Sequence, residues 1–357
     1  MLEVQNFLYS KSLEKLTSQF AIKAKRHQQY PNLISLNYDQ IGSPKTHPIV
    51  RECRGLILDE AENWQVVAYP YRRFFNVGEG GANLIDWNSA RCYEKCDGSL
   101  CILYFYKKHW HVATRGIPDA SGQVNRLAKS FQDLFWQVWK ELNYHLPQST
   151  NCCYMFELMT PYNRVVVQQQ KNQLLLHGVR DLLSHQEIDP VKVANDYGWH
   201  SVPTYPLQAL DEILAAAKSL EPMQSEGYII CDRNFNRIKV KSPTYVAVAH
   251  LKDGLSKRRL LEILIANESD EFLSYFPEWS ELYHQIKRQI NSLAQDVEAV
   301  YKTHQDLKSQ KDFALAVKDY PLSRVLFLKR ANKIASITEG IYSLSVQNLE
   351  QLLLAKN

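Results

Sequence analysis

The stretch YEKCDGSL, residues 93–100, places Lys95 two residues before an Asp-Gly pair. The segment SLCILYFYKKHWHVATRG, which overlaps its end, is typical of two antiparallel strands joined by a short turn. Lysine before Asp-Gly at a hairpin tip is ordinary turn chemistry. The alternative is that Lys95 is a nucleophile, and the surrounding sequence must distinguish the two.

A lysine amine is a poor nucleophile at neutral pH, because a reference pKa of about 10.4 leaves only about one molecule in 2,500 neutral. A site that uses lysine must depress this pKa by neighbouring positive charge or by desolvation. Polyphosphate substrates also need cations along their length and a metal for the leaving pyrophosphate. If Lys95 is a nucleophile, we expect further basic residues whose side chains point into the same site. We also expect carboxylates that could bind a metal and a ribose.

Residues of these types occur in order along the chain: Arg54 in ECRGL, Arg73 in YRRFFN, Glu157 in YMFELM, Glu226 in EGYII, and Lys239 with Lys241 in IKVKS. Residues two apart in a strand share a face, so Lys239 and Lys241 point to one side together. Each signal alone is weak, since a K-x-K strand is most often a solvated sheet face and Glu-Gly is usually a turn. Their combination and order favour the interpretation that Lys95 is a nucleophile.

Residue patterning predicts an α+β chain with two domains. Strands are expected in GLILDE, WQVVAYP, CYMFELM, RVVVQQQ, QLLLHGVRD, EGYIICD and RIKVKS, and helices over 1–27, 123–142 and 208–219. After Ala249 the periodicity is helical throughout. We expect antiparallel sheets with flanking helices over residues 1–250, followed by an all-α domain over 251–357.

The composition is that of an ordinary globular protein, with 357 residues, 45% hydrophobic residues and 22% charged residues. The formal net charge of +4 permits a polyanionic partner without demanding one. The seven cysteines show no C-x-x-C spacing and no signal-peptide pattern precedes them, which favours reduced thiols in a cytoplasm. No apolar run reaches the roughly 18 residues needed to span a bilayer, so no membrane is expected.

The set of segments resembles the covalent nucleotidyltransferases, which include polynucleotide ligases and mRNA capping enzymes. It is more similar to the RNA ligases that resemble the tRNA-repair ligase of T-even bacteriophages. The segments that carry this resemblance are LNYDQIGSP (36–44), RECRGLILD (51–59), YPYRRFFNVGE (69–79), EKCDGSL (94–100), ATRGI (113–117), FELMTPYNRVVV (156–167), HGVRD (177–181), EGYII (226–230) and RIKVKSPTYVAVAH (237–250). The resemblance spans most of residues 30–250 and is faint beyond them.

This resemblance implies an ATP-dependent RNA ligase with a nucleotidyltransferase domain over residues 1–250. Lys95 would carry AMP, and Lys239 and Lys241 would grip the α-phosphate. The residues implied in nucleotide binding are Tyr38, Arg54, Arg73, Gly98, Arg115, Glu157 and Glu226. Of these, Glu157 would meet the ribose hydroxyls. Glu226 would hold Mg²⁺ or Mn²⁺, with Asp270 as a second metal candidate.

Other residues remain open. Tyr245 fits either end joining or core packing, Phe75 fits support of the sheet better than base stacking, and Asp270 also fits an acidic helix cap. Arg180 is a weaker candidate for the site. His111 and His177 are interpreted as ordinary packed or surface residues, because this chemistry needs no imidazole base. Arg73 and Arg115 stand where the family usually has lysine, which keeps the charge but changes its reach.

The helical tail is where substrate specificity is expected. Residues 301–333 hold eight Lys or Arg and three acids; this pattern fits either a solvated helix surface or phosphate contacts to a folded RNA. By resemblance the partner is an RNA with a break, with a tRNA anticodon loop as the leading candidate, and the protein is expected to be a monomer. The alternatives are a DNA ligase or guanylyltransferase on the same fold, and a catalytically inactive relative that only binds RNA. The first two usually carry an OB-fold after the K-x-K strand, and no segment here reads as one.

Overall fold

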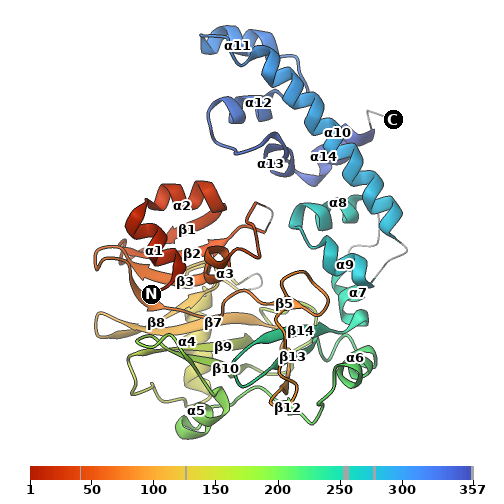
Figure 1. The fold of residues 1–357 in the computed structure, drawn as a ribbon. Helices are drawn as coiled ribbons and strands as arrows, with labels where there is room; N and C mark the ends of the chain where they lie inside the picture. Colours follow the sequence, from red (N-terminus) through yellow and green to blue (C-terminus); the bar gives the residue numbers. More distant parts are fainter. Residues whose placement is uncertain (41, 125–126, 252–256, 276–278, 355–357) are drawn as a thin grey trace. The chain divides into compact units, whose positions relative to one another are not determined.

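The computed structural model describes residues 1–357 except 41, 125–126, 252–256, 276–278 and 355–357 (Figure 1). The chain divides into two compact units, the first formed by Met1–Asp39 with Ser43–Ala249 and the second by Gln40–Gly42 with His250–Asn357. The first unit mixes strands and helices, whereas every described element that lies wholly in the second unit is a helix. The predicted α+β class, with antiparallel sheets and a helical C-terminal region, is confirmed.

Three sheets form the first unit. The first sheet has the strand order β1 (Ile22–Arg26), β2 (Leu33–Tyr38), β3 (Arg54–Asp59), β4 (Gln65–Ala68). The second has the order β11 (Glu187–Ile188), β10 (Gln173–Asp181), β9 (Cys152–Met159), β7 (Ser99–Tyr106), β8 (His109–Thr114). The third has the order β12 (Thr204–Tyr205), β6 (Arg91–Glu94), β13 (Gly227–Cys231), β14 (Arg237–Lys241), β5 (Phe75–Asn76). Neighbouring strands are antiparallel except β14 and β5, which run parallel.

The first and second sheets pack face to face, and the two-residue period of β7 explains how. Ile102 and Tyr104 lie in a buried cluster with residues of the first sheet. Cys101 and Leu103 point the other way, into a cluster with α4 (Phe131–Glu141) and α5 (Pro190–Tyr197). The second sheet is therefore covered on both faces, which explains why its strands are apolar at almost every position.

The remaining helices of the first unit cover the outer sheets. The helices α1 (Glu3–Ser10), α2 (Leu13–Phe20) and α3 (Pro48–Glu52) pack on the first sheet. The helix α6 (Leu210–Lys218) packs on β13 and β14 of the third sheet through Ile213 and Ala217. The strand β14, which carries Lys239, and the strand β13, which Glu226 directly precedes, thus have one face against a helix and the other face available for a site.

The second unit is an all-helical bundle that α7 (Pro243–Leu251) leads into from the first unit. Its helices are α8 (Lys257–Ala266), α9 (Ser269–Tyr275), α10 (Ser280–His304), α11 (Gln310–Val317), α12 (Ser323–Arg330), α13 (Ile337–Tyr342) and α14 (Val346–Leu354). Along α10, Ile286, Ile290, Leu293 and Val297 recur at helical spacing and are buried in one core. Among the described residues, no helix combines the length and the apolar character needed to cross a bilayer.

Three predicted elements are wrong. The segment RVVVQQQ (164–170) is not a strand, because the backbone N–H groups of Val166 and Val167 donate to the buried carboxylate of Asp97 at 2.8 and 2.6 Å rather than to a neighbouring strand. The helix expected from 123 begins only at Phe131, where Ser130 and Asp133 form a capping box. The helical pattern expected over 1–27 ends at Phe20, and Ile22–Arg26 is instead β1, paired with β2.

Candidate active site

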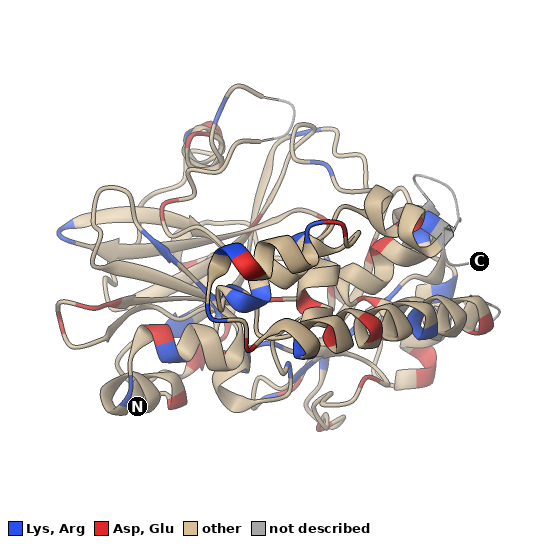
Figure 2. Ribbon diagram, turned by 90° about the horizontal axis from the view of Figure 1, so that it is seen from above, with Lys and Arg blue, Asp and Glu red and all other residues tan. Residues whose placement is uncertain are grey.

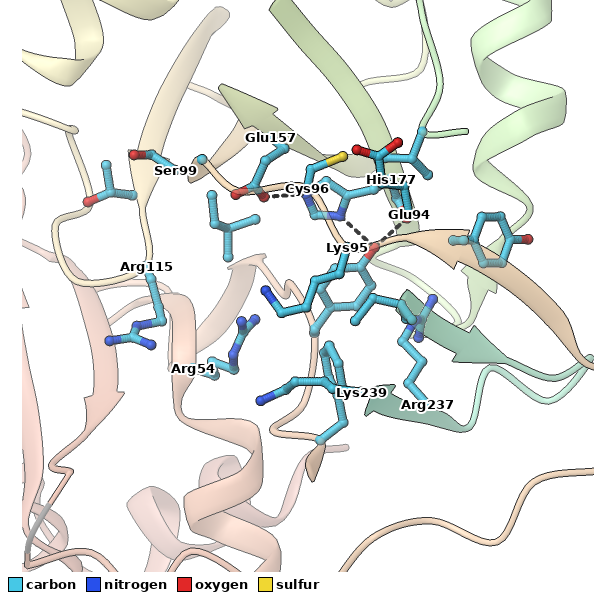
Figure 3. A pocket seen from close by; sticks show the side chains of 18 of the residues that line it. Arg54, Glu94, Lys95, Cys96, Ser99, Arg115, Glu157, His177, Arg237 and Lys239 are labelled. Atoms are coloured by element: carbon cyan, nitrogen blue, oxygen red, sulfur yellow. Dashed lines mark hydrogen bonds and ion pairs between the residues drawn. The ribbon is translucent and has the colours of Figure 1, made fainter. Parts of the chain in front are cut away.

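A cavity of about 710 Å³ lies in the first unit, a volume suited to a small-molecule ligand (Figure 3). Of the predicted site residues, those that line it are Lys95, Lys239, Lys241, Arg54, Gly98, Arg115 and Glu157. They come from strands or connections in all three sheets. The structure therefore brings together residues that are up to 187 positions apart in the sequence.

Lys95 is held at the end of β6. Its backbone N–H donates to the carbonyl of Gly227 at 2.8 Å, and its Nζ lies 2.6 Å from Oε2 of Glu226. The other oxygen of Glu226 lies 3.6 Å from Nζ of Lys241. Glu226 is buried, with 7% of its side chain exposed, so one carboxylate joins the predicted nucleophile to the K-x-K strand.

The two lysines of β14 share a face as expected. Ile238, before the two lysines, and Val240, between them, are buried against α6, while Lys239 and Lys241 line the cavity. Lys239 Nζ lies 5.3 Å from the centre of the Phe74 ring, and the Arg54 guanidinium lies 5.7 Å from the same ring. Phe74, which the sequence analysis did not single out, thus contacts two cations of the site.

Arg54 is prepared for an anionic ligand. Its Nη1 is buried and has no hydrogen-bond partner among the described residues. Burial lowers the pKa of Arg54, and the nearby Arg115 lowers it further, whereas Tyr38 opposes this. A guanidinium starting above about 12 stays charged under such a shift. A phosphate oxygen would supply the missing hydrogen bond, and leaving such a group unpaired is costly.

Tyr38 and Arg73 lie behind the cavity wall, beside Arg54 and Arg115. Arg73 Nη1 donates to the Tyr38 hydroxyl at 2.7 Å, and its guanidinium lies between the rings of Tyr38 and Phe75 at 4.9 and 4.8 Å. Burial alone would raise the pKa of Tyr38, but the charges of Arg54, Arg73 and Arg115 lower it overall. Phe75 is buried beneath this cluster, which agrees with its expected supporting role.

Gly98 and Asp97 fix the loop that follows Lys95. A Cβ on Gly98 would lie 2.5 Å from the carbonyl oxygen of Leu158, so glycine is required by the approach of β9. Asp97 accepts from the backbone of Val166 and Val167 and, at 2.9 Å, from the Tyr245 hydroxyl. Tyr245 is 4% exposed. Its structural role is therefore bracing Asp97, which the K-x-D-G pattern alone did not reveal.

His177 was interpreted as an ordinary residue, and the structure places it in the cavity wall beside Glu157. Its Nε2 lies 3.3 Å from Oε2 of Glu157, and its Nδ1 lies 2.9 Å from the Tyr71 hydroxyl. A glycine inside a strand pattern often marks a bulge, and Gly178 was the signal available in the sequence. His111 by contrast packs among aromatic rings, 5.6 Å from that of Tyr104, as expected.

Arg180 belongs to a buried network outside the cavity lining. It contacts Glu187 at 2.8 Å, and Arg237 contacts the same carboxylate at 2.6 Å. Arg237 lines the cavity and lies 4.4 Å from the Tyr71 ring. Neither Glu187 nor Arg237 was singled out in the sequence, because a lone charged residue in a strand carries no distinguishing pattern.

The site offers a carboxylate as a possible metal ligand, but the described residues do not form a complete metal-binding site. No group of three or more His, Cys, Asp or Glu side chains with metal-site geometry occurs among the described residues. Mg²⁺ is typically held by one or two carboxylates together with substrate phosphates, and Glu226 fits that arrangement. Asp270 is exposed at the start of α9 in the second unit, so its role as a metal ligand stays a prediction.

The three sheets gather Lys95 and further cations, among them Arg54 and Lys239, around a single cavity. Such an arrangement is suited to binding phosphate groups. Comparison with known proteins identifies which kind of protein this is. The sequence profile of the RNA ligase family matches residues 52–245, more than half of the chain, and this range contains Lys95, Glu226 and Lys241. The chain belongs to the RNA ligase family.

Two relatives show the extent of the similarity. An RNA ligase of Rhodothermus phage RM378 is 25% identical over 346 residues, covering 75% of this chain and 78% of that protein. A protein of Autographa californica nuclear polyhedrosis virus, described as a bifunctional polynucleotide kinase/RNA ligase, is 28% identical over 302 residues. That match covers 78% of this chain but only 42% of the viral protein.

Solved structures give weaker likenesses. An archaeal ATP-dependent RNA ligase has a TM-score of 0.46 and 12% identity, covering 74% of this chain and 68% of that chain. A Naegleria gruberi RNA ligase variant with ATP and Mn has a TM-score of 0.33 and 17% identity, covering 45% of this chain and 51% of that chain.

Proposed function

We propose that this chain is an ATP-dependent RNA ligase that carries AMP on Lys95. The observation that supports it most is the position of the Lys95 amine, which lies in the cavity 2.6 Å from Glu226 and shares that carboxylate with Lys241. A surface turn lysine would point into solvent, whereas 20% of the Lys95 side chain is exposed. Membership of the RNA ligase family supplies the reaction class.

In the first step, the Lys95 amine attacks the α-phosphorus of ATP. A P–N bond forms, the bond between the α-phosphorus and the bridging oxygen breaks, and pyrophosphate leaves. The Lys95 ammonium has to pass one proton to solvent before attack, because an ammonium nitrogen has no lone pair, and the nitrogen passes a second proton to solvent as the P–N bond forms. Loss of the positive charge also ends the ion pair with Glu226. Arg54, Lys239 and Lys241 stabilise the charge on the phosphates. A divalent metal held by Glu226 would neutralise further phosphate charge.

In the later steps, an oxygen of the RNA 5′-phosphate attacks the α-phosphorus of the bound AMP and displaces the Lys95 amine, which regains a proton. The RNA 3′-hydroxyl then attacks the activated 5′-phosphorus, so that a phosphodiester bond forms, AMP leaves and the hydroxyl proton passes to solvent. Both steps need the same cationic cavity, because each transition state gathers negative charge at phosphorus.

The test is transfer of label from ATP to the protein. Wild-type protein with α-labelled ATP and Mg²⁺ or Mn²⁺ should acquire one label per chain that survives denaturation and is lost in acid, as a phosphoramide requires. Lys95→Ala should acquire none, whereas Lys140→Ala, at an exposed lysine of α4, should label normally. Label persisting in Lys95→Ala would contradict the proposal. Absence of label in the wild type would instead favour an inactive RNA-binding relative.

The same assay separates the other candidates. Competition by GTP in place of ATP would favour a guanylyltransferase. Sealing of a nicked DNA duplex in preference to broken RNA would favour a DNA ligase. Removal of the divalent metal with EDTA should abolish labelling, and re-addition of Mg²⁺ and Mn²⁺ separately would show which one the enzyme prefers.

We assign adenylate transfer to the first unit and RNA binding to the second. The proposed substrate is a broken tRNA anticodon loop, and the protein is proposed to act as a monomer in the cytoplasm. In the basic segment 301–333, the Arg330 guanidinium already has partners within the protein, because it contacts the Leu307 carbonyl and lies 4.4 Å from the Phe313 ring. Lys329 likewise donates to the Ala335 carbonyl at 2.7 Å. The exposed members are Lys302, Lys308, Lys311, Lys318, Arg324 and Lys333.

Charge along this unit is mixed, since Figure 2 shows Lys and Arg interleaved with Asp and Glu on its long helix. Phosphate contacts from the exposed basic residues would make RNA affinity fall steeply with salt. Replacing Lys308, Lys311 and Lys318 with glutamine should reduce that salt dependence and leave adenylylation of Lys95 unchanged. An unchanged salt dependence would contradict the assignment of RNA binding to this segment.

A further inference from the structure

A β-bulge aims His177 at the cavity. The pairing of β9 with β10 shifts between Leu176 and Gly178, so that His177 is the extra, unpaired residue. Bulges redirect single side chains and are common beside active sites. A Cβ on Gly178 would lie 2.1 Å from the Tyr71 hydroxyl oxygen. Glycine therefore makes room for Tyr71 next to the bulged histidine.

Tyr71 holds the imidazole in place from behind. Its hydroxyl lies 2.9 Å from Nδ1 of His177 and also contacts the carbonyl oxygen of that residue. The two rings are stacked, with centroids 5.4 Å apart. Tyr71 is itself fixed by the Arg237 guanidinium, 4.4 Å from its ring. The orientation of His177 is thus set by contacts that do not involve any ligand.

The free end of the imidazole faces Glu157. Nε2 lies 3.3 Å from Oε2 of Glu157 but out of line for a hydrogen bond, and it has no other hydrogen-bond partner among the described residues. Catalytic hydrogen bonds in ligand-free sites are often long and poorly aligned, and they tighten when the ligand binds. Figure 3 shows this pair on one side of the cavity, with Arg54, Arg115 and Lys239 on the other.

We propose that His177 is a positioning residue that fixes the Glu157 carboxylate for the ribose of ATP, and thereby sets the preference of the enzyme for ribonucleotides. This inference depends on the proposed function, in which Glu157 accepts from a ribose hydroxyl. Once this contact tightens on ligand binding, His177 engages one oxygen of Glu157, and the other oxygen is left for the sugar. An unrestrained glutamate would lose part of that contact to side-chain freedom.

The test compares adenylylation of Lys95 with ATP, 2′-deoxy-ATP and 3′-deoxy-ATP. Wild-type protein should prefer ATP over at least one deoxynucleotide by about tenfold, the effect of one hydrogen bond of about 1.4 kcal/mol. His177→Leu should lower kcat/KM for ATP by about tenfold and change that for the disfavoured deoxynucleotide by less than about twofold. The preference should therefore collapse, which a general loss of packing would not cause.

Two further variants keep the test decisive if His177→Leu does not fold. His177→Gln places an amide N–H near the position of Nε2 and should restore at least half of the preference. Tyr71→Phe removes the contact to Nδ1 and should weaken the preference without touching Glu157. His109→Leu, at an exposed position of β8, should behave as wild type.

Equal losses for all three nucleotides in His177→Leu would overturn the inference, as would a preserved preference or a wild type that does not discriminate. In each of these cases the wild type still forms the adduct, so the proposed function stands. A wild type that forms no adduct with ATP would overturn the proposed function and this inference together.

Discussion

At the level of single residues, Glu226 combines an observed contact to two lysines with a proposed role as metal ligand. The sequence suggested a metal ligand, and the structure shows its carboxylate against Lys95 at 2.6 Å and Lys241 at 3.6 Å. The cations around Lys95 are therefore accompanied by one buried anion. This carboxylate fixes the Lys95 amine in this structure.

The backbone conformation of Gly227, the residue directly after Glu226, helps to position the Glu226 carboxylate and can be tested by substitution. Its φ is +144°, and a Cβ there would lie 2.3 Å from the carbonyl oxygen of Val240. Gly227→Ala should lower the free energy of unfolding by about 2 kcal/mol or more, because the strain and the clash add. Chemical denaturation followed by tryptophan fluorescence measures this change.

The matched control is Gly80→Ala, since a Cβ at Gly80 meets nothing within 4 Å and no positive φ is found there. That variant should unfold within about 0.5 kcal/mol of the wild type. If the two variants were equally stable, the glycine at 227 would not be required by the fold.

His27 gives the stability of the first unit a pH dependence. Its Nδ1 accepts from the backbone of Gln29 at 3.1 Å and of Tyr30 at 3.2 Å, which requires that nitrogen to be unprotonated. Burial lowers the pKa of His27, although Asp119 opposes the shift. Because the unfolded chain binds the proton more readily, this stability is present above about pH 6.5 and is lost as pH falls through the folded pKa.

The expected result is that wild-type stability falls between pH 7.5 and pH 5.5 more steeply than that of His27→Asn, by up to about 1.4 kcal/mol per pH unit. Asparagine can accept the same backbone donors without titrating. His109→Asn, at an exposed position, should keep the wild-type slope. Parallel slopes for wild type and His27→Asn in urea denaturation would refute the assignment.

At the level of elements, Glu187 joins the second sheet to the third. It sits on the two-residue strand β11, contacts Arg180 of β10 and contacts Arg237 of β14 through both oxygens at 2.6 and 3.0 Å. Burial alone would lower the pKa of Arg237, but the Glu187 charge raises it. The strand that carries Lys239 and Lys241 is thus tied to β10 by one buried carboxylate.

Glu187→Ala should therefore lower the free energy of unfolding by about 3–5 kcal/mol, since it leaves two buried guanidinium groups without their partner. Glu60→Ala is the matched control, because Glu60 pairs with Arg26 at 2.7 Å in an exposed position. That change should cost at most about 1 kcal/mol. Thermal and urea unfolding of both variants measure the change in the free energy of unfolding. If the two variants lost similar amounts of stability, the buried network would not join the sheets.

Elements with a regular period were predicted well, and those that depend on distant partners were not. The alternation in β14 and the apolar run of β9 identified these strands correctly. RVVVQQQ has a strand composition, yet its backbone donors are taken by Asp97, which is 69 residues away from Val166. The same limit applied to His177, because a bulge arises from how two strands pair and one strand alone does not show it.

At the scale of the whole molecule, the sequence predicted correctly several of the residues that surround Lys95. It was a poorer guide to the contacts that each of these residues makes. Lys239, Lys241, Arg54, Arg115 and Glu157 do line one cavity. Their roles follow from distances that no sequence pattern contains, such as the shared Glu226 carboxylate. The family profile covers residues 52–245, which lie entirely within the first unit. The part of the chain proposed to select the RNA lies after it.

The most direct measurement is the identity of the residue that carries the nucleotide. Wild-type protein would be incubated with ATP and Mg²⁺ without RNA, digested at alkaline pH to preserve the P–N bond, and mapped by mass spectrometry. We expect one AMP on the peptide that contains Lys95, and no adduct in Lys95→Arg. An AMP on any other residue, or an adduct that persists in that variant, would contradict it.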